Sequence, residues 1–134
     1  MTPPPRVAAQ PLVVVADVQA ASAWYRQVLG MTSGHGGDEY ERLIVDGELI
    51  LQLHHSGVDH HHGPLSDPSH PRGNGVILWF ALDDFDDAVA RSRAIGADVE
   101  MDVHVNPNAK QRELWLRDLD GYRVVLAERT SYDR

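Results

Sequence analysis

The stretch ELWLRDLDGYRVVLAE, residues 113–128, decides how this chain folds. Apolar residues alternate on both sides of Asp118-Leu119-Asp120-Gly121, and this pattern predicts two antiparallel strands joined by a tight turn. An earlier stretch, YERLIVDGELILQLHH (residues 40–55), has the same design around Asp46-Gly47. Two hairpins of one design in a short chain indicate an internal repeat.

A strand and a helix precede each hairpin. Leu12–Val15 is a β-branched strand, and residues 18–29 carry apolar side chains at helical spacing. We expect Asp17 to cap the start of this helix and Gly30 to end it. The second half repeats the plan, since a shift of 66 residues places Asp17 on Asp83 and Gly30 on Gly96. Its strand and helix lie in residues 75–96, where one side of the helix carries Phe85, Ala88, Val89, Ser92 and Ile95, and a further strand is expected in residues 96–105.

Two motifs carry a resemblance to a known family. VADVQAASAWYRQVLGM (residues 15–31) and RDLDGYRVVLAE (residues 117–128) resemble motifs of the vicinal oxygen chelate superfamily, which includes glyoxalase I, extradiol dioxygenases and bleomycin-resistance proteins. Leu119 departs from the family pattern, which usually has proline there. The resemblance implies one α+β domain of two β-α-β-β-β modules, whose curved sheets form a shared cleft with the helices outside. We expect module 1 at about 9–66, module 2 at about 67–130 and a disordered tail at 1–8.

The resemblance also locates the positions where the family holds a metal ion. These positions fall on Gln10, Gln52, Ile77 and Val125. Isoleucine and valine cannot ligate a metal, and a neutral amide is a weak ligand without anionic or imidazole partners. We therefore expect no metal and no cofactor at the usual site. A displaced site made from His54, His104 and Glu113 is the alternative.

The cleft is expected to bind a small molecule. Strand alternation turns two tryptophans and several polar groups inward, a composition typical of such sites. Aromatic faces suit planar rings or cations, and the net charge of −8 also favours a cation. The predicted ligand-binding residues are Gln52, His54, Trp79, His104, Asn106, Glu113 and Trp115; the catalytic residues, if there are any, are not identified.

Histidines gather in one segment. Six of the eight lie between His54 and His70, in a stretch without periodicity that predicts a long loop. The tract His60-His61-His62 is interpreted as part of a solvated loop, although any tract of this kind is able to bind zinc or nickel.

Composition excludes several classes of protein. The 134 residues suffice for one domain with its own core, and the absence of cysteine excludes disulfides and thiolate chemistry. A net charge of −8 excludes a nucleic-acid partner and an anionic membrane surface. No apolar run approaches the roughly 20 residues needed to span a bilayer, so we expect a cytoplasmic protein. The resemblance to the superfamily also implies that the protein forms a homodimer.

Three functions are compatible with these observations. The first is a metal-free binding protein like the bleomycin-resistance branch, which confers antibiotic resistance by sequestering a planar or cationic natural product. The alternative is a lyase, isomerase or dioxygenase that uses a displaced metal, or His54 or His104 as general base with Glu113. The third is an interaction module whose cleft is filled. The sequence leaves open whether the protein is an enzyme.

Overall fold

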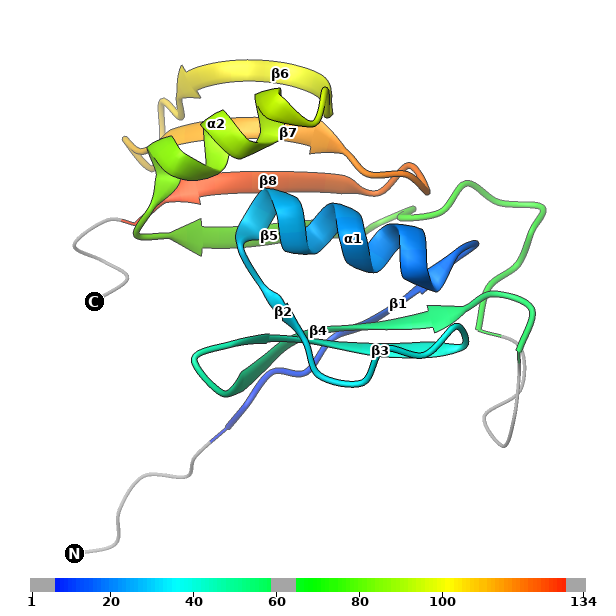
Figure 1. The fold of residues 1–134 in the computed structure, drawn as a ribbon. Coiled ribbons are helices and arrows are strands. Elements are labelled where there is room, and N and C mark those ends of the chain that lie inside the picture. Colours follow the sequence, from blue (N-terminus) through cyan, green and yellow to red (C-terminus); the bar gives the residue numbers. More distant parts are fainter. Residues whose placement is uncertain (1–6, 59–64, 130–134) are drawn as a thin grey trace, which may run out of the picture.

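The computed structural model describes residues 7–58 and 65–129 and folds them into two four-stranded sheets and two helices. Figure 1 shows the two sheets one above the other, with α1 and α2 running along them. Residues 1–6 of the predicted tail and the histidines His60, His61 and His62 lie outside the described residues. No helix in the described part of the chain is long and apolar enough to cross a membrane.

The first module follows the predicted order closely. Asp17 caps α1 by accepting a hydrogen bond from the Ala20 backbone N–H at 3.0 Å, and Gly30 ends the helix with a left-handed φ of 71°. Asp46 and Gly47 both have positive φ, as the predicted two-residue hairpin turn requires. The elements are β1 (Leu12–Val15), α1 (Val18–Leu29), β2 (Thr32–Ser33), β3 (Tyr40–Val45) and β4 (Glu48–His55).

The second module repeats this order with a shorter helix. The helix α2 begins after Asp84 rather than Asp83, and Asp84 makes no side-chain capping bond. Of the five residues predicted on one side of this helix, Phe85, Ala88 and Ser92 are buried and Val89 packs partly buried against the core, whereas Ile95 is 36% exposed at the helix end. The elements are β5 (Ile77–Leu82), α2 (Phe85–Ala94), β6 (Asp98–Val105), β7 (Arg112–Arg117) and β8 (Arg123–Glu128).

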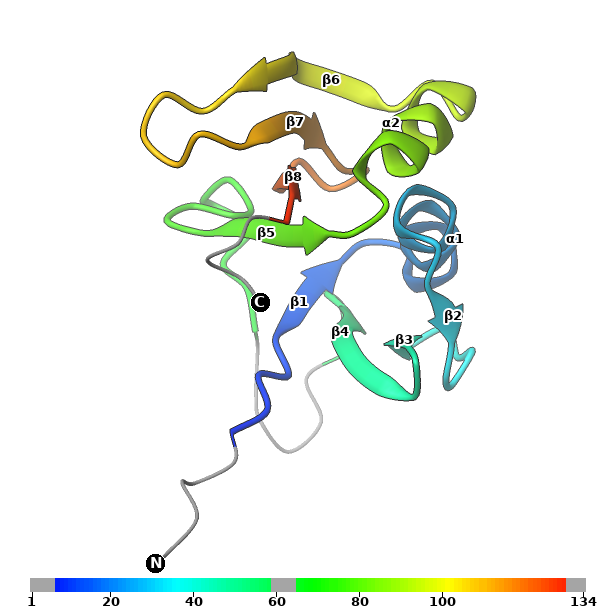
Figure 2. The ribbon, with the colours of Figure 1, turned by 90° about the vertical axis from the view of Figure 1, so that its left-hand side faces the viewer.

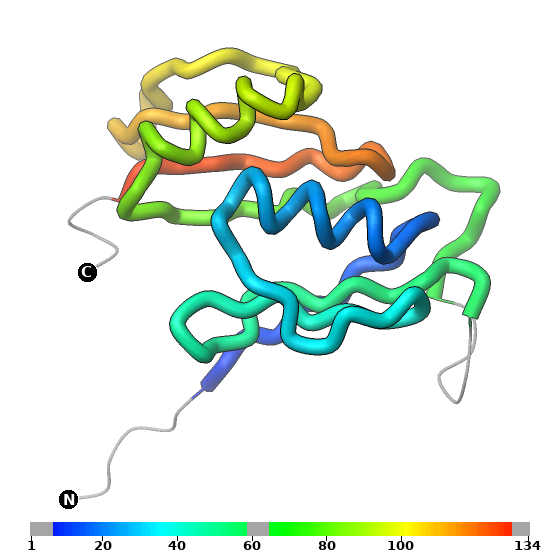
Figure 3. The backbone as a smooth tube through the Cα atoms, in the orientation of Figure 1, coloured from blue at the N-terminus to red at the C-terminus, as the bar shows by residue number. Residues whose placement is uncertain are grey.

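Both sheets have the same topology, which confirms the repeat and the α+β fold of two modules. The strand orders are β1-β4-β3-β2 and β5-β8-β7-β6, and the first strand of each module lies parallel to its last. Figure 3 shows the backbone passing from the first sheet, in blue to green, to the second sheet, in green to red. The 66-residue shift nevertheless pairs opposite faces of β1 and β5, because it places the core residue Val13 on the half-exposed Trp79. A slip of one residue reverses every side chain of a strand.

The helices and the core lie on one side of the sheets. Figure 2 shows α1 and α2 side by side with the strands next to them. Fully buried leucines of both sheets meet the helices in one continuous core: Leu43, Leu51, Leu53, Leu114, Leu116 and Leu126. Alternate residues of the same strands point away from the helices, and we call these two surfaces the open faces of the sheets.

The acidic turn after β7 joins the two modules. Asp118 accepts a hydrogen bond from the Tyr25 hydroxyl of α1 at 2.6 Å, and the Tyr122 hydroxyl donates to the Val14 carbonyl at 2.9 Å. Asp120 accepts from the Ala16 backbone N–H at 2.8 Å and pairs with Arg72. This cluster of side chains, the inter-module clasp, gives the turn a structural role.

Candidate functional site

A buried carboxylate organises the open face of the second sheet. Glu113 on β7 is fully buried, and it accepts hydrogen bonds from the Asn106 amide at 2.7 Å and from the Trp115 indole N–H at 2.9 Å. The His104 Nε2 atom lies 3.5 Å from the same carboxylate. Burying a carboxylate is costly unless donors surround it, so these neighbours fix its position. Four of the predicted site residues thus form one cluster.

Trp115 is held by its neighbours. The Arg123 guanidinium lies 5.0 Å from the centre of its ring, a cation–π distance, and the His104 ring meets it edge-on at 5.8 Å. The indole N–H is engaged by Glu113. Trp115 therefore serves to build this face, and only part of its ring remains accessible.

Trp79 is the more accessible aromatic side chain of this face. It lies on β5, and its strand partner Val125, which also pairs with Trp115, separates the two tryptophans. Trp79 is 46% exposed, whereas Val125 is fully buried. A large aromatic ring left half exposed beside a cavity is a typical feature of a small-molecule site.

The predicted residues of the first sheet are held more tightly than expected. The Gln52 side chain accepts a hydrogen bond from the Tyr40 hydroxyl at 2.5 Å and donates one to the Gln10 carbonyl at 2.8 Å. Both ends of its amide are therefore engaged within the chain. His54 is 6% exposed, with Nδ1 2.9 Å from the His55 carbonyl. Neither side chain belongs to the Glu113 cluster.

The side chains present do not suit the metal that the fold family implies. Val125 is buried apolar surface, and Gln52 is already hydrogen-bonded. Across residues 7–58 and 65–129, no three His, Cys, Asp or Glu side chains come together in a way that would hold a metal ion. His104 and Glu113 do meet, but the third member of the proposed displaced site, His54, is on the other sheet. The described residues therefore do not assemble that alternative metal site.

A large cavity lies between the modules beside Trp79. It measures about 830 Å³, and its walls come from the segment before β1, from the β3–β4 hairpin and from β5. An adjoining cavity of about 630 Å³ shares Ile50, Trp79 and Phe80 with it and continues toward the end of α1. Arg42 and Ile50 line this space although sequence analysis did not select them. The alternation that placed Gln52 on the open face also places its strand partner Arg42 there.

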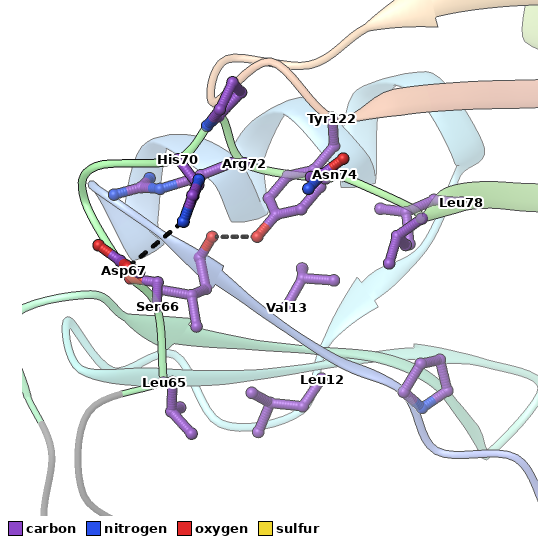
Figure 4. Close-up of a pocket in the computed structure, with 15 residues that line it drawn as sticks. Leu12, Val13, Leu65, Ser66, Asp67, His70, Arg72, Asn74, Leu78 and Tyr122 are labelled. Carbon is purple, nitrogen blue, oxygen red and sulfur yellow. Dashed lines mark hydrogen bonds and ion pairs between the residues drawn. The ribbon is translucent and has the colours of Figure 1, made fainter.

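A smaller cavity lies at the other end of the junction between the modules. It measures about 340 Å³ and lies between β1 and the segment before β5, with Tyr122 at one side (Figure 4). The charged groups around it pair within the chain, since His70 lies 3.6 Å from Asp67 and Arg72 binds Asp120. We therefore take the Trp79 cavity as the candidate site.

The comparisons with known proteins agree with this fold. The model of the glyoxalase/bleomycin resistance protein/dioxygenase superfamily matches residues 7–126. The chain belongs to this superfamily. No curated protein matches the sequence significantly.

Solved structures show the same fold at low sequence identity. An integron cassette protein from the mobile metagenome of V. cholerae is 18% identical with a TM-score of 0.72, over 97% of this chain and all of that one. TioX from Micromonospora sp. ML1 is 20% identical with a TM-score of 0.70, over 92% of this chain and all of that one. Lactoylglutathione lyase from Agrobacterium tumefaciens is 22% identical with a TM-score of 0.66, over 94% of this chain and 96% of that one. At these identities the likeness concerns the fold.

Proposed function

We propose that the protein binds a planar small molecule in the cavity beside Trp79 and sequesters it without using a metal. The observation that carries this proposal is the half-exposed indole of Trp79 in a cavity of about 830 Å³ that both modules line. An indole offers a flat apolar surface against which a planar ring stacks, and the surrounding walls bury the rest of the ligand. Sequestration of a natural product, and hence antibiotic resistance, is the biological role that follows.

The donor set supports binding without a metal. Of the positions where the family holds its metal, Gln52 has both ends of its amide hydrogen-bonded within the chain, and Val125 is apolar and buried. Hard or borderline divalent ions require carboxylates or imidazoles. Binding of the ligand should then survive treatment with EDTA unchanged. Loss of binding in EDTA that is restored by added zinc would refute the metal-free proposal.

A second candidate function rests on the contact between His104 and Glu113. The His104 Nε2 atom lies 3.5 Å from the buried Glu113 carboxylate, and its Nδ1 atom lies 2.8 Å from the Asp102 carbonyl. The imidazole serves as a general base once one of these nitrogens turns toward a substrate. The His104 side chain is 27% exposed, so a substrate on the open face is able to reach it. Under this alternative the protein is a lyase or isomerase, and His104→Gln abolishes turnover while leaving binding in the Trp79 cavity intact.

Tryptophan fluorescence tests the proposed site directly. The chain has three tryptophans, and of these Trp24 is buried in the core. The neutral arylamine N-phenyl-1-naphthylamine is a suitable planar probe. We expect it to quench the wild-type protein, and we expect Trp79→Ala to weaken its binding about fivefold or more, which corresponds to about 1 kcal/mol.

The matched control is Trp115→Phe, which keeps an aromatic ring and leaves Trp79 in place. It should retain most of the probe affinity. Equal affinity of the wild type and Trp79→Ala would refute the site. We also propose that the protein is a cytoplasmic homodimer, and light scattering of the purified chain measures its mass.

A further inference from the structure

Arg42 differs from the other arginines of the structure. Its guanidinium makes no hydrogen bond or ion pair within residues 7–58 and 65–129, although the chain carries 20 acidic residues. Every other arginine in those ranges has a side-chain partner: Arg26, Arg72, Arg91, Arg93, Arg112, Arg117, Arg123 and Arg129. An arginine without a partner in so acidic a protein leaves its donors available to something else.

The position of Arg42 places this cation in the candidate site. Arg42 lies on β3 opposite Gln52 and lines the same cavity as Trp79. It is half buried, whereas Glu48, the acidic side chain of that cavity, is exposed at the hairpin. Charges that are partly removed from water act more strongly on a ligand than exposed ones. The cavity therefore favours an anionic group near Arg42, despite the negative net charge of the chain.

The adjoining cavity favours an uncharged, apolar group. Its walls include Leu29, Met31 and Phe80, and it shares Trp79 with the larger cavity. The charges at its edge neutralise one another, since Arg91 pairs with Asp84 at 2.9 Å and Arg129 with Asp83 at 3.4 Å. A ligand that fills both cavities thus meets a free cation at one end and apolar surface at the other.

We propose that the ligand of this protein is an aromatic anion. Its carboxylate, sulfonate or similar group pairs with the Arg42 guanidinium, its ring stacks on Trp79, and its apolar remainder enters the adjoining cavity. A planar guanidinium suits such a group because it donates two parallel hydrogen bonds to two oxygens. The inference rests on the proposed function, since it requires a ligand beside Trp79. It replaces the cationic ligand that the net charge favours.

Two probes that share an aromatic body separate the effect of charge from that of shape. The probes are 8-anilinonaphthalene-1-sulfonate, which is anionic, and N-phenyl-1-naphthylamine, which lacks the sulfonate. Both probes are titrated into the wild type and into Arg42→Gln, and circular dichroism is used to check that each variant is folded. Arg93→Gln is the matched control, because it removes the same charge from the exposed side of α2, where Arg93 pairs with Asp102.

We expect Arg42→Gln to weaken binding of the sulfonate probe roughly tenfold and to leave the neutral probe within about twofold. Arg93→Gln should change neither. If the neutral probe binds at Trp79 and Arg42→Gln affects both probes equally, the anion inference fails while the proposed function stands. If Trp79→Ala affects neither probe, both proposals fail. An equal loss of sulfonate binding in Arg93→Gln would assign the effect to net charge and overturn the inference.

Discussion

Removing the Tyr25 hydroxyl should destabilise the protein more than removing any comparable hydroxyl of the clasp. Tyr25 is fully buried, and its hydroxyl donates to the Asp118 carboxylate at 2.6 Å. Asp118 has backbone donors on its other oxygen only, from Asp120 and Tyr122. Tyr25→Phe therefore leaves one oxygen of a buried carboxylate without its donor. A lost hydrogen bond to a charged group costs about 1.5–3 kcal/mol.

Tyr122→Phe is the matched control for this change. Its hydroxyl is buried too, but it donates to the neutral Val14 carbonyl at 2.9 Å. A neutral hydrogen bond contributes about 0.5–1.5 kcal/mol, so the control should lose less stability. Urea unfolding of both variants at neutral pH gives the two differences in the free energy of unfolding.

The pH dependence supplies a second test of the same contact. Burial raises the pKa of Asp118 above its usual 3.8, so the proton binds more tightly in the folded than in the unfolded protein. Folding stability contributed by this group is therefore present at low pH and is lost as the pH rises from about 3.8 through the folded pKa. Above that range Asp118 is ionised and needs the Tyr25 donor most.

The cost of Tyr25→Phe should consequently be larger at neutral pH than in mild acid. In acid Asp118 is protonated, and the lost contact is a neutral hydrogen bond. A cost that is independent of pH, and no larger than that of Tyr122→Phe, would refute the assignment of an ionised Asp118 to the clasp. Because each variant is compared with the wild type at the same pH, other titrating groups cancel to first order.

Four further substitutions test other parts of the structure. Burial by itself raises the pKa of Glu41, but hydrogen bonds from the Ser33 and Ser22 hydroxyls and from the backbone N–H groups of Gly36 and Arg42 outweigh it and hold the pKa at about 2. Glu41 thus contributes stability that is present above its unfolded pKa of 4.5 and is lost as the pH falls toward about 2. Glu41→Gln removes hydrogen bonds to a charged group, so it should lower the free energy of unfolding by about 2–3 kcal/mol at neutral pH and by much less in acid. The same loss at both pH values in urea titrations would contradict this. Asp17→Ala removes a capping bond and should cost about 1 kcal/mol. Asp84→Ala removes no capping bond and only an exposed ion pair with Arg91, so it should cost less than about 1 kcal/mol. Thermal melts of the two variants measure both costs. Trp115→Phe leaves the buried Glu113 carboxylate without one hydrogen-bond donor and should lower the free energy of unfolding by about 1–3 kcal/mol. Unchanged stability would show that a water molecule takes the place of the indole N–H.

Sequence patterns predicted the fold because each element carries its own local signal. Asp17 and Gly30 bracket α1 through capping and through a left-handed residue, which are properties of neighbouring residues alone. The Asp46-Gly47 turn sets the β3–β4 hairpin in the same way. The start of the second helix was predicted less well. The 66-residue shift places Asp17 on Asp83, whereas α2 begins after Asp84, which makes no side-chain capping bond that would mark the start.

The candidate site was predicted in part, since faces follow from alternation but contacts do not. Alternation placed Glu113 and Trp115 on one face, and the structure brings His104 and Asn106 to them across the β6–β7 hairpin. It could not show that Gln52 is engaged by Tyr40, or that His54 is buried. Such facts depend on how long side chains meet after the strands have paired.

Arg42 shows where the limit of sequence reasoning lies. Its place on the open face follows from period-two alternation with Tyr40 and from its pairing with Gln52. What makes it important is that no acidic side chain reaches its guanidinium within the described residues, and this is a property of the whole structure. The net charge of −8 pointed to a cationic ligand because it counts all acids equally. The acids pair with the other arginines around the rest of the molecule, so the charge that a ligand meets in the cavity has the opposite sign to that of the chain.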